Sequence, residues 1–265
     1  MNTLNTSFHK LIEGWRACKL DNSPYLFPGD EFLLENKYQK YWQNISSFKE
    51  YIESPEFGLK TQKKLHLGLI PIPYIGDLKN ATIFILMLNP DLAAGDFRAE
   101  EDNDSYKRTL IENLHQKNLD VKYPLFTLNP SFAWHPGFGY WHKKLGQVIR
   151  LLARQRKISY LDALSVFAKE LACVELVPYH SKSFGVHSII KHLASSKAVL
   201  EFVHDVLVPQ ALSGKALIIA TRRGRDWELP EHEKIVVYNQ YESRASHLTI
   251  GSRGGKAILQ HLGMS

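Results

Sequence analysis

Polar side chains suited to hydrolysis accompany two apolar runs of this sequence. Asn89 ends the first run and precedes Pro90, and the carbonyl of its side chain can hold a water molecule. An amide is a weaker base than a carboxylate, so it would orient the water rather than deprotonate it. Glu175 lies inside the second run, and His180 follows it. These residue types predict a site that positions water against a polar substrate.

Basic and aromatic side chains follow two further apolar runs. Three arginines and a tryptophan come after the third run. Asn239 follows the fourth run and opens a polar segment that contains His247 and leads into a helix. Arginines and the backbone N–H groups of a helix N-terminus both bind phosphate. The residues expected to contact nucleic acid are Arg222, Arg223, Arg225, Tyr241, Arg244, Arg253 and Lys256.

Each of these features also has a purely structural explanation. An Asn before Pro is often a turn former, arginines after a strand are usually solvated, and Glu175 could be a structural acid. The recurrence of such residues after four successive apolar runs favours a functional site.

The apolar runs that position these side chains are typical of strands buried on both faces of a sheet. They lie at residues 81–90, 173–179, 215–221 and 234–239. Segments with helical spacing lie between them, at residues 140–155, 159–172 and 188–208. Strands that alternate with helices predict an α/β fold with a parallel sheet, in which ligands bind beyond the carboxyl ends of the strands.

Two parts of the chain are expected. Residues 66–265 should form one three-layer α/β/α sandwich around a mostly parallel central sheet, and residues 1–65 should form a helical N-terminal extension. Within the sandwich, turn formers in residues 69–81 predict irregular backbone, and residues 91–122 predict a loop followed by a helix.

Composition limits the class of protein. The chain has 265 residues, a net charge of +6 and 44% hydrophobic residues, which permits a globular protein with a nucleic-acid partner. No apolar stretch approaches the ~18 residues of a membrane helix, and the N-terminus lacks the features of a signal peptide. Two cysteines are too few for a disulfide scaffold. We expect a cytoplasmic monomer that does not bind membranes.

The motifs of several common chemistries are absent from the sequence. It contains no glycine-rich nucleotide-binding motif, no Gly-x-Ser-x-Gly and no His-Glu-x-x-His. His135 and His142 lie seven residues apart. Pro136 and Gly137 are expected to break a helix between them, so both histidines are interpreted as pocket or packing residues. The sequence therefore predicts no metal and no cofactor.

The segment from Met87 to Asp91 is similar to the water-activating motif of the uracil-DNA glycosylase superfamily, which reads Gly-x-Asn-Pro-Gly in several branches. It keeps the Asn-Pro pair and differs at both ends. Members of this superfamily are single α/β/α domains. The likeness spans roughly residues 70–262 in the order of elements, and residues 1–65 have no counterpart in the minimal family domain.

Two later segments extend this resemblance. Glu175 stands where family members carry a base-reading residue, commonly Asn. Asn239-Gln240-Tyr241 occupies the place of the final family motif, which enters the DNA minor groove. The resemblance implies a monofunctional, metal-free DNA glycosylase that hydrolyses the N-glycosidic bond of a flipped-out base. Asn239, or alternatively His247, would donate a hydrogen bond to the leaving base.

A base that leaves the DNA stack usually rests on an aromatic ring. The candidates for that ring are Phe126, Phe132 and Trp134. Arg244 and Tyr241 would fill the vacated stack or hold phosphate.

The residues at two of these positions suggest the target base. The uracil-specific branch has an aromatic residue after the motif proline, which crowds C5 of the base, whereas this chain has Asp91. A carboxylate at Glu175 would accept from the cytosine amino group and repel O4 of uracil. We therefore expect a cytosine with a bulky 5-substituent, such as the hydroxymethyl or glucosylated cytosine of phage DNA, and a role in antiviral defence. The alternative is that Glu175 is structural and another residue, such as His180, reads the base.

Other functions remain open from the sequence. One is a catalytically silent nucleic-acid-binding domain on the same fold, and another is a uracil or thymine-mismatch glycosylase. A nuclease or toxin would need carboxylates for Mg²⁺, which Asp91, Asp96 and Glu175 could supply. An enzyme acting on free nucleosides is the last alternative.

Overall fold

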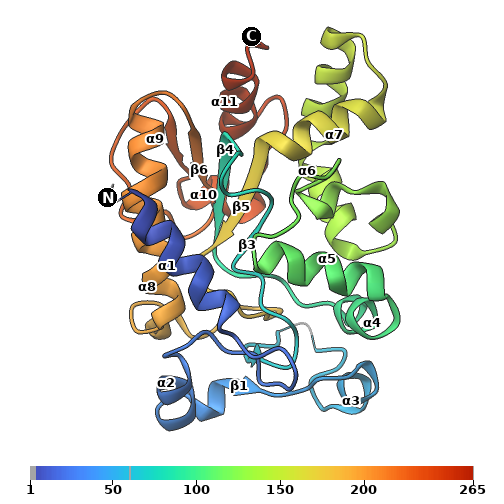
Figure 1. Ribbon diagram of the computed structural model, residues 1–265, viewed down its shortest axis with the longest axis vertical. Helices are drawn as coiled ribbons and strands as arrows, with labels where there is room; N and C mark the ends of the chain where they lie inside the picture. Colours follow the sequence, from blue (N-terminus) through green and yellow to red (C-terminus); the bar gives the residue numbers. More distant parts are fainter. Residues whose placement is uncertain (1–3, 60, 265) are drawn as a thin grey trace. The chain divides into compact units, whose positions relative to one another are not determined.

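The computed structural model describes residues 4–59 and 61–264, which form a mixed α/β structure (Figure 1). The chain divides into two compact units, each assembled from separated segments. The first unit comprises Met1–Tyr74, Leu88–Lys117 and Glu175–Val203. The second comprises Ile75–Met87, Asn118–Val174 and His204–Ser265.

A five-stranded sheet has the strand order β3-β5-β4-β6-β7. Its strands are β3 (Tyr74–Ile75), β4 (Ile83–Met87), β5 (Leu171–Glu175), β6 (Leu217–Ala220) and β7 (Ile235–Val237). All four strands predicted from apolar runs are therefore confirmed. β4 pairs with β6 in parallel, and β6 pairs with β7 in parallel, so this part of the sheet is parallel as predicted.

The prediction of irregular backbone at residues 69–81 is wrong at β3. Proline lacks an N–H group but keeps its carbonyl, so a proline-rich segment can still accept ladder bonds. Pro73 does so, since its carbonyl oxygen accepts from the Glu175 N–H at 2.8 Å.

The first unit is mainly helical, and residues 1–65 belong to it. Its elements are α1 (Leu4–Arg16), α2 (Glu31–Asn36), η1 (Gln39–Tyr41), β1 (Trp42–Gln43), α3 (Phe48–Glu53), β2 (Leu65–His66), α4 (Ala94–Asp102), α5 (Asp104–Leu114), η4 (His187–Ile189) and α8 (Ala194–Phe202). α1 packs along α8 through its buried face, which includes Leu11 and Trp15 (Figure 1). β1 and β2 form a small parallel sheet that the sequence did not predict.

Residues 91–122 contain two helices rather than the one expected. α4 and α5 are separated at Asn103, whose side chain accepts from the Tyr106 N–H at 2.8 Å and caps α5. An Asn at this position favours a new helix start over continuation of the preceding helix.

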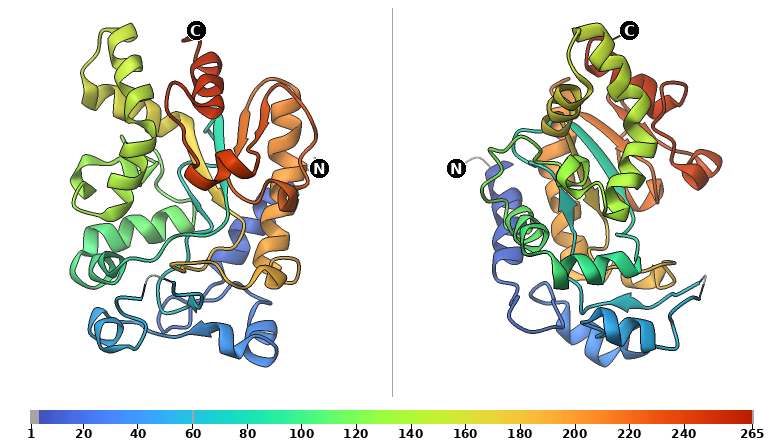
Figure 2. Two further views of the ribbon diagram at one scale, coloured as in Figure 1. Left: turned by 180° about the vertical axis from the view of Figure 1, so that it is seen from behind. Right: turned by 90° about the vertical axis from the view of Figure 1, so that its right-hand side faces the viewer.

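The second unit contains the remaining helices. They are η2 (Phe126–Leu128), η3 (Pro130–Phe132), α6 (Pro136–Arg156), α7 (Tyr160–Glu170), α9 (Val208–Leu212), η6 (Gly224–Trp227), α10 (Gln240–Ala245) and α11 (Arg253–His261). α6 and α7 lie side by side (Figure 2). The helix expected at residues 188–208 begins only at Ala194, with α8, and changes to a π-helical turn (η5, Val203–Leu207) shortly before Pro209.

The expectation that Pro136 and Gly137 break a helix is also wrong. Pro136 is the first residue of α6, where a proline ring is tolerated because that N–H has no helical partner. The His135 ring caps the helix, since its Nδ1 accepts from the Gly137 N–H at 3.1 Å. His142 lies within the same helix. No helix among the described residues is long and apolar enough to cross a membrane.

Candidate active-site groups

Asn89 belongs to the first unit and lies two residues after the end of β4, where backbone bonds hold the chain on both sides of it. The Leu88 carbonyl accepts from the Val177 N–H at 2.8 Å, and the Pro90 carbonyl accepts from the Ser181 N–H at 3.1 Å. The segments after β4 and β5 thus remain paired beyond the ends of both strands. Asn89 therefore occupies a fixed backbone position.

The side-chain amide of Asn89 has a defined orientation. Its Nδ2 donates to the Ser181 hydroxyl at 2.9 Å, to the Pro90 carbonyl at 2.9 Å and to the Tyr179 carbonyl at 3.3 Å. Main-chain carbonyls only accept, so the amino group and not the oxygen must face them. Oδ1 of this half-buried side chain has no hydrogen bond to any residue that the structure describes, and it remains an acceptor for water.

Glu175 also belongs to the first unit. It is the last residue of β5, and only 5% of it is exposed. An ionised carboxylate only accepts hydrogen bonds, so at this strand end it would select donors on a ligand.

The His180 ring bonds to the main chain. Its Nδ1 lies 2.8 Å from the Asp91 carbonyl oxygen and its Nε2 lies 3.3 Å from the Ile70 carbonyl oxygen. The ring is buried, and a proton on Nδ1 satisfies the shorter bond. His180 thus fixes the backbone at Asp91, which makes it a poor candidate for the base reader. The Asp91 carboxylate is itself 72% exposed and lies 3.7 Å from the Lys182 ammonium.

Two buried titratable groups beside His180 were missed by sequence reasoning. Both oxygens of the Glu100 carboxyl group lie within hydrogen-bond distance of the Ile70 N–H, at 3.1 and 3.2 Å. Burial is the main reason that the pKa of Glu100 rises to about 8, and the nearby Asp96 adds to the increase. Burial lowers the pKa of His66 to about 3, so its ring is neutral at physiological pH. No local motif marks either residue, because their burial comes from tertiary packing.

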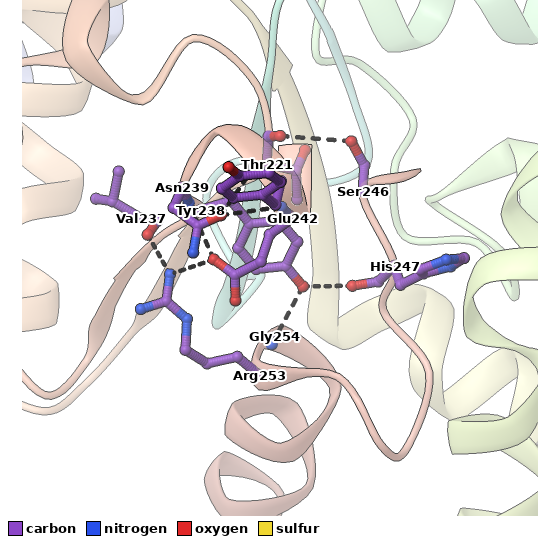
Figure 3. A network of polar contacts seen from close by, with 10 residues as sticks. Thr221, Val237, Tyr238, Asn239, Glu242, Ser246, His247, Arg253 and Gly254 are labelled. Carbon is purple, nitrogen blue, oxygen red and sulfur yellow. Dashed lines mark hydrogen bonds and ion pairs between the residues drawn. The ribbon is translucent and has the colours of Figure 1, made fainter. Parts of the chain in front are cut away.

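Asn239 is the N-cap of α10 in the second unit (Figure 3). Its Oδ1 accepts from the N–H groups of Tyr241 at 2.9 Å and of Glu242 at 3.0 Å. The Glu242 carboxylate returns a bond to the Asn239 N–H at 2.9 Å, which completes a capping box. The amide oxygen is therefore turned toward the helix, and the exposed Nδ2 is left as a donor, with no hydrogen-bond partner within residues 4–59 and 61–264.

The main chain at His247 is held by Tyr238. The Tyr238 hydroxyl donates to the His247 carbonyl and accepts from the Gly254 N–H at 3.1 Å (Figure 3). A side chain at Gly254 would overlap with that hydroxyl, and one at Gly255 would overlap with the Thr249 carbonyl. The glycine pair therefore allows the loop to close onto α11, while the His247 ring is exposed and points away from Tyr238.

The predicted DNA-contacting cations fall into two sets. Arg253 donates to the Val237 carbonyl and to the Glu242 carboxylate, and Arg223 forms an ion pair with Asp226. Both arginines thus have partners within the protein, but their side chains are partly exposed, and their contact with DNA stays a prediction. The cations without an ion pair among the described residues are Arg222, Arg225, Arg244 and Lys256.

The aromatic candidates differ in exposure. Phe126 is 1% exposed and Phe132 is 4% exposed, so neither ring has a face open to a base. Both are corrected to core residues. Trp134 is 51% exposed, and its indole N–H donates to the Ser131 carbonyl at 3.1 Å, which orients the ring. Tyr241 is 78% exposed beside the Arg244 guanidinium, which lies 5.7 Å from the centre of its ring.

A carboxylate metal site of the kind a nuclease needs is not found. Within the described part of the chain, no three His, Cys, Asp or Glu side chains gather as a ligand set. Asp96, one of the three carboxylates considered for that role, accepts from the Ala93 N–H at 2.6 Å and caps α4.

The two asparagines therefore differ in the group that each leaves without a partner among the described residues. Asn89 presents a carbonyl oxygen, and Asn239 presents an amide N–H group. No family model, no curated protein and no solved structure matches the chain.

Proposed function

We propose that this chain is a monofunctional DNA glycosylase that hydrolyses the N-glycosidic bond of a flipped-out base and leaves an abasic site. The observation that carries the proposal is the orientation of the Asn89 amide, whose amino group is held by two main-chain carbonyls and the Ser181 hydroxyl and whose Oδ1 is left as an acceptor for water. Such hydrolysis needs an acceptor that holds the attacking water and a donor that stabilises the anion of the departing base. The proposal includes the three-layer α/β/α fold of the uracil-DNA glycosylase superfamily.

In the proposed reaction, the water oxygen attacks C1′ of the deoxyribose. The C1′–N bond breaks, and its electron pair leaves with the base. One water proton ends on the base, and the remaining hydroxyl stays on C1′. Asn89 Oδ1 accepts from the water and orients it, while Asn239 Nδ2 or the His247 ring donates to the base as negative charge develops.

Exposed and half-buried residues of the second unit would bind the DNA. Arg222, Arg225, Arg244 and Lys256 suit the phosphate backbone because no described carboxylate neutralises them. Trp134 offers an aromatic face for the flipped base, and Tyr241 offers one to fill the gap that the base leaves.

We propose that the target is a cytosine with a bulky 5-substituent, as in hydroxymethylated or glucosylated phage DNA, and that the chain acts as a cytoplasmic monomer in antiviral defence. Support comes from the buried carboxyl group of Glu175, which in its ionised form is an acceptor only, and from the exposed Asp91 carboxylate. Glu175 suits the cytosine amino group, and Asp91 leaves room beside Asn89-Pro90 for a polar substituent on the base.

The test is a base-release assay with purified protein. The protein is incubated, in the presence of EDTA, with duplexes that carry glucosylated hydroxymethylcytosine, hydroxymethylcytosine, uracil or unmodified cytosine. The duplexes are then scored for alkali-labile sites. We expect abasic sites in the modified-cytosine duplexes and no strand cleavage before alkali. Absence of release from every duplex would refute the glycosylase. Trapping of the protein on DNA by borohydride would refute its monofunctional character.

A further inference from the structure

Ser246 joins three elements of the second unit. It is buried and adopts a left-handed conformation, with φ of 48°, directly after α10. Its hydroxyl donates to the Ser243 carbonyl at 2.9 Å and lies 3.4 Å from the Thr221 carbonyl oxygen at the end of β6 (Figure 3). This contact places Arg222, the next residue after Thr221, close to the segment that presents His247.

Lys144 of α6 reaches the same turn. Its ammonium group donates to the Ala245 carbonyl at 2.9 Å and to the Ser246 carbonyl at 2.7 Å. It also lies 4.8 Å from the centre of the Tyr140 ring. An ammonium group has three donors, so one remains available for a ligand.

The surroundings of Lys144 are cationic. The pKa of Lys144 falls to about 8, first because it is buried and then because Arg222 and Lys143 are near. None of these three cations has an ion pair with a carboxylate in the described residues. Like charges that are gathered without a counter-charge attract an anion, which would relieve their repulsion.

We propose that Lys144 and Arg222 together bind one phosphate group, and that this group is a backbone phosphodiester of DNA beside His247. The identity of the ligand as DNA rests on the proposed function. Arginine offers a planar fork and lysine a compact charge, and both suit a phosphate oxygen. Lys144 donates a hydrogen bond to the carbonyl of Ser246, the residue before His247. A phosphate bound to Lys144 would therefore lie next to His247, which is a candidate donor to the base.

The experiment measures how DNA affinity depends on salt concentration. It uses an unmodified duplex, which contains no target base. The variants are Lys144→Met, Arg222→Met and the double variant, because methionine keeps the apolar stem and removes the charge. Each single change should lower the slope of log affinity against log salt, and the double variant should lose about one unit in total, since one phosphate is released. Lys215→Met is the control, since Lys215 is exposed and precedes β6, whereas Arg222 follows it.

Other outcomes separate the alternatives. Parental slopes in both single variants, with altered unfolding only, would assign Lys144 to anchoring α10 and overturn the proposal. A loss of about two units in the double variant would indicate two separate phosphates and overturn the shared site. If the duplex protects Lys144 from chemical acylation, the ligand is a DNA phosphate as proposed. Equal protection by inorganic phosphate or a deoxynucleoside monophosphate would overturn that assignment. Base release by the parent protein is measured in a separate assay. If the variants lose salt dependence but the parent releases no base, the glycosylase is refuted and the phosphate site is still supported.

Discussion

The amides of Asn89 and Asn239 are oriented mainly by the main chain. Reversing Asn89 would turn its oxygen toward two carbonyl oxygens, and reversing Asn239 would turn its amino group toward two N–H groups. Reversal of Asn89 would leave partly buried groups without partners, which costs about 1–3 kcal/mol for each group, whereas reversal of Asn239 would break the exposed cap of α10. The direction in which each amide faces a ligand is therefore a property of the fold.

Replacement of Asn89 tests the water-positioning role. Asn89→Ala should lower single-turnover base release by ~10²-fold or more, with little change in DNA affinity, because a positioned water acts in the transition state. Ser181→Ala is the matched control. It removes one acceptor of the Asn89 amino group but leaves both carbonyl acceptors, so its effect should be much smaller. Equal rates for the parent and Asn89→Ala would remove Asn89 from the mechanism.

Replacement of Glu175 tests the reading of the base. Glu175→Asn replaces a pure acceptor by an amide that can pair with uracil, so the ratio of cytosine-type to uracil release should shift toward uracil by about tenfold or more. The ratio is measured by competition between two labelled duplexes in one reaction. Thermal unfolding of the variant controls for loss of structure. An unchanged ratio in a folded, active variant would assign Glu175 to a structural role.

At the residue scale, sequence reasoning used residue type and did not predict exposure. The position of Asn239 at a helix start could be expected because the residue comes directly before α10. Burial of Phe126 and Phe132 could not be found, because their short 3-10 segments carry no periodic pattern. Arg223 pairs with Asp226 within one short segment, whereas the partners of Arg253 lie 11 and 16 residues away in the chain, which sequence spacing does not reveal.

At the scale of elements, four strands of the main sheet were predictable from continuous apolar runs, whereas β3 and the junctions between elements were not. A proline in the sequence is compatible with either the end or the start of a helix. Pro136 is at the start of α6. Ser246 carries no sequence signal, because its position depends on contacts with three separate segments.

The loop between α10 and α11 depends on one hydroxyl group. Tyr238→Phe should lower the free energy of unfolding by about 1–3 kcal/mol, because it leaves the His247 carbonyl and the Gly254 N–H without their partner. Urea denaturation measures the change. Tyr241→Phe is the control, because the Tyr241 ring is 78% exposed, and it should unfold like the parent. Equal stability of all three proteins would show that the hydroxyl does not hold the loop.

At the scale of the whole molecule, one buried carboxyl should make stability depend on pH. The pKa of Glu100 is raised from 4.5 to about 8, mainly by burial. In the unfolded chain the group ionises near its ordinary value. Between about pH 5 and pH 8 unfolding therefore releases a proton, and the free energy of unfolding falls as pH rises. The stabilising contribution of the protonated carboxyl is complete at lower pH and is lost across this window.

Glu100→Gln separates that effect from the titration of other groups. Glutamine keeps an oxygen that accepts from the Ile70 N–H, and it does not ionise. The parent and the variant should have similar free energies of unfolding near about pH 5, and the variant should become the more stable protein as pH approaches 8. Urea denaturation at a series of pH values measures the difference. A difference that stays constant across the series would show that Glu100 is ionised in the folded protein, and its bonds to Ile70 would then be those of a carboxylate.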